Sequence, residues 1–151
     1  MVEVFTVLTD SGKRLISEGL IGYNYETEEP FDMYHVRWFR VGSGGYQGGN
    51  VITPDPRRTN LVNPTTELSE INIARINEFN CPTWTIILGV GIGGDMSEVG
   101  LFGRRIKTFD ASTGNVTYYN NEDPVLYCYG TFGQFSKDVS ETDTIEVSVQ
   151  F

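Results

Sequence analysis

The stretch Thr144-Ile-Glu-Val-Ser-Val-Gln-Phe151 alternates apolar and polar side chains without a break. Its apolar residues are separated by Glu146, Ser148 and Gln150. Successive side chains of a β-strand point to opposite faces of a sheet. The period of two therefore predicts a strand with one packed face and one solvated face.

Further segments rich in aromatic and β-branched residues precede this strand. The clearest is Phe31-Asp-Met-Tyr-His-Val-Arg-Trp-Phe-Arg-Val41, whose polar residues are too closely spaced for an apolar helix stripe. The other expected strands span residues 71–76, 83–90, 98–102, 116–119 and 125–132, with turn-forming clusters at 91–95, 110–115 and 120–124. Short strands at this spacing predict a mainly β fold, an antiparallel β-sandwich or an open barrel.

One segment has the period of a helix instead. Residues 9–20 begin with cap-forming side chains, and we expect one short N-terminal α-helix that ends near Gly19 or Gly22. The apolar residues on one face of this helix are Leu15, Ile16 and Leu20.

The composition limits the class of protein and of partner. The 151 residues are 39% apolar, 13% aromatic and 21% charged, which indicates a folded chain, and no repeat or linker divides residues 1–151 into more than a single domain. The net charge of −9 argues against nucleic acid and anionic membrane as partners, because both need a field of the opposite sign. The sequence contains no run of 18 apolar residues, so no membrane span is predicted. The carboxylates of Glu3, Asp10 and Glu18 in the first twenty residues argue against a secretory signal.

A glycine-rich run invites a comparison with cofactor-binding loops. The run Gly89-Val-Gly-Ile-Gly-Gly94 follows an apolar segment, as a dinucleotide-binding fingerprint would. Gly100 and Gly103 then interrupt any helix, so no helix N-terminus follows to hold a phosphate. We therefore expect a connection between two strands and no cofactor.

Histidine and cysteine are too few and too scattered to predict catalysis or a metal site. His35 is the only histidine, and no Gly-x-Ser-x-Gly motif is present. Cys81, Cys128 and His35 lack the paired spacing of structural zinc sites, so neither a metal nor an enzyme activity is expected. Two cysteines without a CxxC pair favour a reducing compartment, although a disulfide between them stays open.

Two alternative functions remain open at this level. An acidic, aromatic-rich β domain is also compatible with carbohydrate binding, with Trp84, Tyr118 and Tyr119 as exposed stacking platforms. Paired carboxylates are compatible with a glycosidase, although solvated loop charges are the simpler explanation. The carboxylates in question are Glu26, Glu28, Glu29, Asp32, Glu122, Asp123, Glu141 and Asp143. The aromatic residues expected in the core are Trp38, Phe39, Phe102, Tyr127 and Tyr129.

A long connection follows the strand at 31–41. Residues 42–60 contain five glycines and two prolines, and a loop of this length in a compact domain is usually functional or docked on a partner. Pro54 and Pro56 fix its backbone and so reduce the entropy lost when a partner binds. The alternative is a stiff loop that packs on its own domain.

Three segments in order resemble a known family. These motif segments are Leu8-Thr-Asp-Ser-Gly-Lys-Arg-Leu-Ile-Ser17, Thr53-Pro-Asp-Pro-Arg-Arg-Thr-Asn-Leu-Val-Asn63 and Gly93-Gly-Asp-Met-Ser-Glu-Val-Gly-Leu-Phe-Gly103. Val41-Gly-Ser-Gly44 and Leu126-Tyr-Cys-Tyr-Gly-Thr-Phe132 fill the remaining places of the pattern. The pattern resembles that of the phage tail-collar fibre family, the baseplate-proximal domains of bacteriophage tail fibres.

The resemblance implies a non-catalytic structural protein of the virion, assembled into the tail in the bacterial host cytoplasm. Its partners would be baseplate and tail-fibre proteins, and the threefold symmetry of fibres implies a homo-trimer. Family members continue into a long fibre shaft, whereas this chain ends at Phe151, so we expect an adaptor that attaches a separate fibre to the baseplate. The acidic stretch 25–30 and the longer segment 107–124 depart from the family pattern.

The resemblance and the chemistry of the loop together predict the residues of the site. A protein interface is expected at Tyr46, Ile52, Pro54, Asp55, Pro56, Arg57, Arg58 and Leu61. The structural residues of the closing motif are Gly93, Gly94, Glu98, Gly100, Leu101 and Phe102. Glu98 is expected to cap backbone amides or to pair with an arginine, while Leu101 and Phe102 bury the strand.

Overall fold

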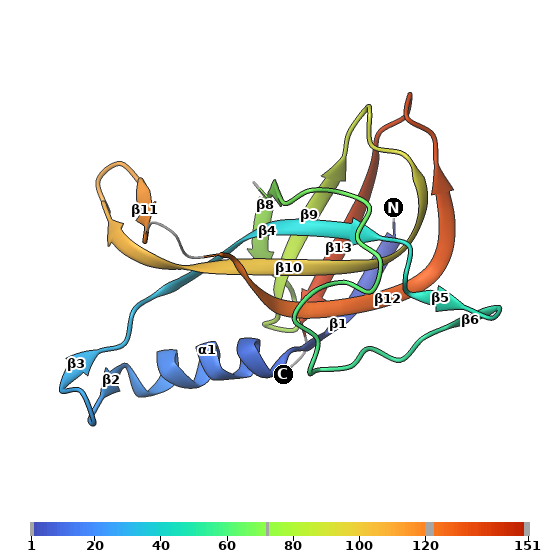
Figure 1. Ribbon diagram of the computed structural model, residues 1–151. Coiled ribbons are helices and arrows are strands. Elements are labelled where there is room, and N and C mark those ends of the chain that lie inside the picture. The colour runs from blue at the N-terminus through green and yellow to red at the C-terminus, as the bar shows by residue number, and fades with distance from the viewer. Residues whose placement is uncertain (1, 72, 120–122, 150–151) are drawn as a thin grey trace.

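The computed structural model describes residues 2–71, 73–119 and 123–149, with only the backbone of Phe5. Glu122 of the acidic stretches, part of the turn at 120–124, and Gln150 and Phe151 of the last expected strand lie outside the described residues. The protein is mainly β with one short helix, and its strongly curled, mostly antiparallel sheet forms a half-barrel (Figure 1). The predicted fold class, mainly β with a sandwich or open barrel and one short N-terminal helix, is confirmed, and of the two architectures the half-barrel corresponds to the open barrel.

Within the described residues, the main sheet has nine strands in the order β7-β4-β10-β12-β1-β13-β9-β8, with β11 paired to β10 beside this path. Their bounds are β1 (Val2–Leu8), β4 (Tyr34–Gly42), β7 (Ser69–Glu70), β8 (Ile73–Ile76), β9 (Pro82–Leu88), β10 (Gly94–Phe109), β11 (Val116–Tyr118), β12 (Val125–Lys137) and β13 (Asp143–Val149). β7 and β8 stand at opposite ends of this order, although only residues 71 and 72 separate them in sequence. The sheet therefore curls until its two edges meet at Ile71, which is buried and donates its N–H to the carbonyl of Arg37 at 2.6 Å.

Two short hairpins project from the main sheet at opposite sides of the molecule (Figure 1). One pairs β2 (Tyr23–Asn24) with β3 (Glu29–Pro30), and the other pairs β5 (Tyr46–Gln47) with β6 (Asn50–Val51). The second hairpin corrects the expectation that residues 42–60 are loop throughout. Its turn is formed by Gly48 and Gly49, whose φ angles of 59° and 81° suit glycine best.

β13 buries the apolar face that its alternation predicts. Ile145, Val147 and Val149 are buried. Ser148 is buried as well, contrary to the prediction of a solvated face, because its hydroxyl meets that of Thr83 at 2.9 Å. β13 pairs antiparallel with β9 and parallel with β1, so the expected antiparallel arrangement is wrong at the second of these pairs.

The other predicted strands occur with different bounds, whereas β1, β2 and β3 lie in segments for which no strand is predicted. β10 runs for 16 residues where only 98–102 is expected, and irregularities in its register at 96–98 and 101–103 let it follow the curl of the sheet. The strand expected at 71–76 corresponds to β8, which pairs with β9, while β7 lies just before that segment and pairs with β4.

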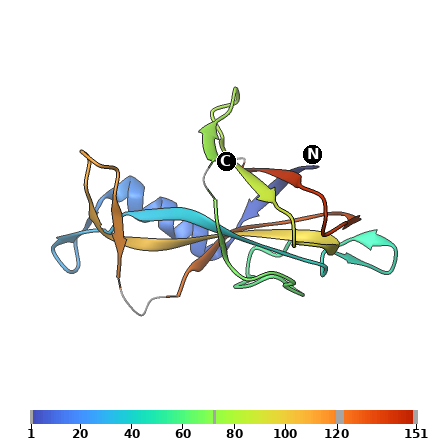
Figure 2. The same cartoon turned by 90° about the horizontal axis from the view of Figure 1, so that it is seen from above.

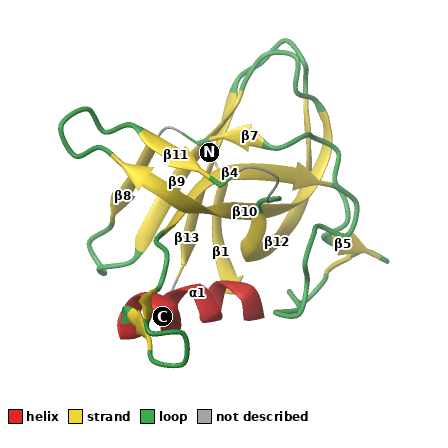
Figure 3. Cartoon of the chain, turned by 60° about the vertical axis from the view of Figure 1, so that its left-hand side comes forward, coloured by secondary structure: helices red, strands yellow, loops and turns green. Residues whose placement is uncertain are grey.

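The one helix among the described residues, α1 (Asp10–Ile21), lies under one end of the half-barrel (Figure 3). Thr9 is its N-cap and accepts the N–H of Gly12, and Gly22 ends the helix with a φ of 75°, so the end is at Gly22 and not at Gly19. Leu15 and Ile16 pack against the core, as predicted. Leu20 is expected on the same face, but it is exposed, so this part of the prediction is wrong. Among the described residues, no helix is long and apolar enough to cross a membrane.

Both faces of the central strands are covered. Leu101 and Phe102 are neighbours on β10 and therefore point to opposite faces of the sheet. Leu101 belongs to the main core inside the half-barrel, whereas Phe102 packs with Leu61, Leu126 and Tyr129 on the other face. The long loop after β6 supplies Leu61 and crosses that other face, opposite β8 and β9 (Figure 2). Of the aromatic residues expected in the core, Trp38 alone is only partly buried.

Candidate protein interface

The carboxylate of Glu98 fixes the long loop on the sheet. Glu98 is fully buried, its Oε1 accepts the backbone N–H of Asn63 at 2.8 Å, and its Oε2 accepts that of Val62 at 3.0 Å. The hydroxyl of Tyr129 donates to the same Oε2 at 2.6 Å. Glu98 therefore caps two backbone amides, which is one of the two roles expected for it, and its remaining partner is a tyrosine and not an arginine.

The loop also needs a glycine beneath it. A Cβ atom at Gly100 would lie 2.6 Å from Cδ1 of Leu61 and 2.7 Å from Cδ1 of Leu126, closer than packed side chains allow. Arg58 closes the cluster from the loop side, with its guanidinium over the ring of Tyr129 at 5.9 Å and its Nε donating to the carbonyl of Asn60. Burial, followed by the hydrogen bond to Glu98, raises the pKa of Tyr129 and keeps its hydroxyl a donor.

The first motif segment meets the same loop. The backbone N–H of Asp10, at the start of α1, donates to the carbonyl of Pro56 at 2.8 Å. Thr9 donates its hydroxyl to the carbonyl of Leu126 at 2.6 Å, which ties the helix to β12. The three motif segments, far apart in sequence, therefore form one contact network. The loop at 53–63 is its centre, with α1 on one side and Glu98 of β10 on the other.

The tip of the loop is an ordered turn on the surface. Asp55 accepts the backbone N–H of Arg57 at 2.9 Å and also pairs with its guanidinium at 3.0 Å. The Arg57 side chain, and then its amide, hold the pKa of Asp55 below its usual value. The tip thus presents a fixed backbone with one exposed arginine to whatever binds it.

The residues expected at the interface divide between the surface and the interior. Arg57 is exposed, and Tyr46, Ile52, Pro54, Asp55, Pro56 and Arg58 are half-buried. Leu61 is buried under the loop, so it holds the loop in place and presents no surface to a partner. In the closing motif, Gly93 precedes β10, Gly94 begins it with a φ of 107°, and Leu101 and Phe102 are buried as predicted.

A lysine that the sequence analysis does not single out holds the glycine-rich run. Lys137 is buried at the end of β12, and its ammonium donates to the carbonyls of Gly89 at 3.0 Å and Ile92 at 2.6 Å. It also donates to the carbonyls of Asp138 at 3.0 Å and Glu141 at 2.5 Å. The run at 89–94 is therefore the connection between β9 and β10, as expected, and the lysine binds it to the connection between β12 and β13.

The side chains proposed as sugar-stacking platforms do not form one. Trp84 is buried, with its ring against that of Tyr127 at 6.3 Å, so the expectation that it is exposed is wrong. The hydroxyl of Tyr118 lies 2.9 Å from Nδ1 of His35, and the Arg104 guanidinium covers its ring at 5.1 Å. Arg105 covers the ring of Tyr119 in the same way, at 4.6 Å. These rings are engaged within the chain itself.

The described carboxylates of the acidic stretches fall into separate groups, one at residues 26–32 and others at 123 and 141–143. Glu26, Glu28 and Glu29 lie on the β2–β3 hairpin, whereas Glu141 precedes β13 and Asp32 is paired with Arg105 at 2.8 Å. Within the part of the chain that the structure describes, no group of three His, Cys, Asp or Glu side chains could hold a metal ion.

Cys81 and Cys128 are both free thiols, so the disulfide that the sequence left open is not formed. Burial raises the pKa of Cys128 to about 12, while Cys81 is partly exposed. We expect one thiol per native chain, Cys81, to react with a thiol reagent near neutral pH, and both to react after unfolding, because the reagent attacks an accessible thiolate. A Cys81→Ser variant should show no native labelling. Two labels per native chain would contradict the burial of Cys128.

Comparisons of the chain with known protein families, with curated protein sequences and with solved structures found no match.

Proposed function

We propose that the protein is a non-catalytic structural protein of a bacteriophage tail, an adaptor that attaches fibres to the baseplate. The observation that carries the proposal is the contact network of the three motif segments. Segments that resemble one family in sequence are also joined in space, through Asp10 to Pro56 and through Val62 and Asn63 to Glu98. One network accounts for all three resemblances.

The form of the loop suits an assembly role. Its buried anchors, Glu98 and Leu61, hold the backbone, and the turn at Asp55 fixes the tip. A surface that is ordered before binding loses less conformational entropy when a partner docks. In the proposal the tip meets a neighbouring tail protein, and three copies of the chain surround the axis of the fibre in the virion.

The proposal is tested at Arg57, which is exposed at the loop tip. In the phage or prophage that encodes the chain, Arg57→Glu is expected to give tails without fibres, because it reverses the charge of the contact surface while the anchors stay intact. Electron microscopy of purified particles counts the fibres. Lys107→Glu makes the same change in charge at another exposed position and should leave the fibres in place. Normal fibres in both variants, or absence of the chain from purified tails, would refute the proposal.

A further inference from the structure

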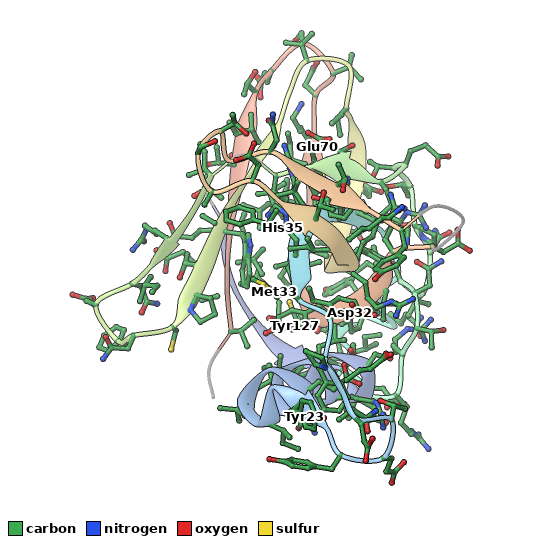
Figure 4. The ribbon with its side chains drawn as sticks, turned by 90° about the vertical axis from the view of Figure 1, so that its left-hand side faces the viewer. Tyr23, Asp32, Met33, His35, Glu70 and Tyr127 are labelled. Carbon is green, nitrogen blue, oxygen red and sulfur yellow. The ribbon has the colours of Figure 1, made fainter. Side chains whose placement is uncertain are left out.

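One end of the molecule exposes an unusual number of apolar side chains. This arm comprises residues 18–33, from the last turn of α1 through the β2–β3 hairpin to the start of β4. Its exposed apolar residues are Leu20 (83% exposed), Tyr25 (79%), Met33 (65%), Ile21 (61%) and Tyr23 (36%). The arm extends away from the half-barrel in Figure 1, and Asp32 and Met33 lie where it returns toward His35 in Figure 4. Exposed apolar groups gathered in this way mark interaction surfaces.

The arm is also strongly acidic. No lysine or arginine occurs between Leu15 and Val36. The carboxylates in this interval are Glu18, Glu26, Glu28, Glu29 and Asp32. Arginines from outside the interval pair with two of them, Arg14 with Glu18 at 3.0 Å and Arg105 with Asp32 at 2.8 Å. Among the described residues, no cation pairs with the three exposed glutamates of the hairpin.

Two hollows flank the segment at 31–34, which crosses beside α1. The first has a volume of about 490 Å³ and a largely apolar lining that includes Leu15, Ile16, Met33, Val36 and Tyr127. The second, of about 510 Å³, is polar, and its wall holds Glu18, Glu29 and Asp32 together with Arg14 and Arg105, the arginines paired with Glu18 and Asp32. An apolar trough and a polar trough thus lie side by side, separated only by this segment.

We propose that the arm binds a cationic amphipathic helix of a partner protein. The apolar side of that helix would fill the trough at Met33 and cover Leu20, while its lysines or arginines would face the glutamates. The inference rests on the proposed function only in taking the partner to be another protein of the assembly. It goes further by naming the binding surface and the chemistry of the partner.

Charge selects this occupant. A second copy of the chain would bring the same carboxylates against each other, and nucleic acid or an anionic membrane would be repelled in the same way. A helix fits better than an added strand, because the apolar trough runs along α1 and the surface above Gly19 is open. A Cβ at Gly19 would meet no atom within 4 Å, which leaves room for a close approach between two helices.

The probe is a synthetic peptide of about 18 residues with leucine and lysine at helical spacing, titrated against the intact protein. We expect saturable 1:1 binding that weakens at least about tenfold in Leu20→Ser/Met33→Ser, because the apolar anchors are lost. The matched control is Ile76→Ser/Phe79→Ser, which removes two equally exposed apolar side chains (74% and 73%) from the β8–β9 hairpin. The control should bind the peptide within about twofold of the unaltered protein.

The contribution of the glutamates to binding is tested with two triple variants, each of which replaces three glutamates by neutral glutamines and so changes the net charge by the same amount. Glu26→Gln/Glu28→Gln/Glu29→Gln should weaken peptide binding about five- to tenfold and flatten its dependence on salt. Glu3→Gln/Glu67→Gln/Glu78→Gln removes three exposed glutamates elsewhere and should have little effect. Equal losses in both triple variants would mean that only net charge attracts the peptide, and this result would overturn the proposal.

Two further outcomes would overturn the proposed binding of a partner helix to the arm. The experiments also distinguish a failure of this inference from a failure of the proposed adaptor function. Tighter binding of a peptide that alternates lysine and valine, a strand pattern, would overturn the helical occupant. Unaltered helix binding in Leu20→Ser/Met33→Ser would overturn the site. If the peptide fails while Arg57→Glu still removes fibres from the tail, the arm inference falls and the adaptor function stands. If the peptide binds as expected but the chain is absent from tails, the adaptor function falls and the arm inference stands.

Discussion

Replacement of Glu98 by glutamine is expected to lower the free energy of unfolding by about 2–3 kcal/mol. Glutamine keeps the shape of the side chain but provides one oxygen acceptor, whereas Glu98 accepts the N–H groups of Val62 and Asn63 and the hydroxyl of Tyr129. With the amide oxygen toward Val62 and Tyr129, the new NH₂ group faces the N–H of Asn63. Two donors then point at each other in a buried site, and neither can reach water.

The measurement is urea unfolding together with the melting temperature, which should fall by roughly 5–10 °C for a chain of this length. Glu67→Gln is the matched control, because it makes the same change in the same loop at a side chain that is 99% exposed, and no change in stability is expected from it. Tyr129→Phe should cost less than Glu98→Gln, since it removes one hydrogen bond and keeps the ring.

A local readout separates the anchor from general stability. If Glu98 holds the loop, proteolysis of the folded Glu98→Gln variant should begin within residues 53–63, whereas the Glu67→Gln variant should resist as the unaltered protein does. Unchanged unfolding and unchanged proteolysis in the Glu98 variant would show that the carboxylate is not the anchor. The loop would then have to be held by the packing of Leu61 alone.

The parts of the fold that the sequence predicts are those with a local cause. The alternation in β13 marks the apolar face that packs in the main core, and the ends of α1 follow from the side chain of Thr9 and the left-handed backbone of Gly22. These signals lie within a few residues of the structure that they determine. The class of fold then follows from the number and spacing of such segments.

The pairing of β1 with β13 has no local cause. No strand is predicted at Val2–Leu8, because its apolar residues include the adjacent pairs Val4-Phe5 and Val7-Leu8 and do not alternate. Its parallel partner is chosen by the packing of the whole chain between them. The curl of the sheet is similar, because the meeting of its two edges at Ile71 depends on every strand between β7 and β8.

The candidate site is predicted in part for the same reason. The loop and the amide-capping role of Glu98 follow from motifs and turn chemistry, whereas the burial of Leu61 needs the second covered face of the sheet. One signal for that face is present in the sequence. Leu101 and Phe102 are adjacent, apolar and on one strand, and a strand that is apolar on both sides is covered on both sides. Lys137 gives no comparable signal, because its acceptors are backbone carbonyls, which every residue carries.

Replacement of Lys137 by methionine is expected to lower the free energy of unfolding by about 3 kcal/mol or more, because it leaves four carbonyls without their charged donor. Methionine keeps most of the apolar stem, so the loss reports on the ammonium and not on packing. Lys107→Met is the matched control at an exposed position and should leave stability unchanged. Hydrogen exchange should quicken first at the amide of Gly91, which donates to Val139 between the two connections that the lysine joins.

Chemical rescue distinguishes the ammonium from the space that it fills. Lys137→Ala removes three methylenes and the nitrogen, and propylammonium supplies those same atoms. Its N–H groups can reach the carbonyls of Gly89 and Ile92, so propylammonium should raise the melting temperature of Lys137→Ala and leave the unaltered protein unchanged. Tetramethylammonium has the same charge but no N–H to donate, and no rescue is expected from it. Equal rescue by both ions, or no loss of stability in Lys137→Met, would contradict the view that directed hydrogen bonds from Lys137 join the two connections.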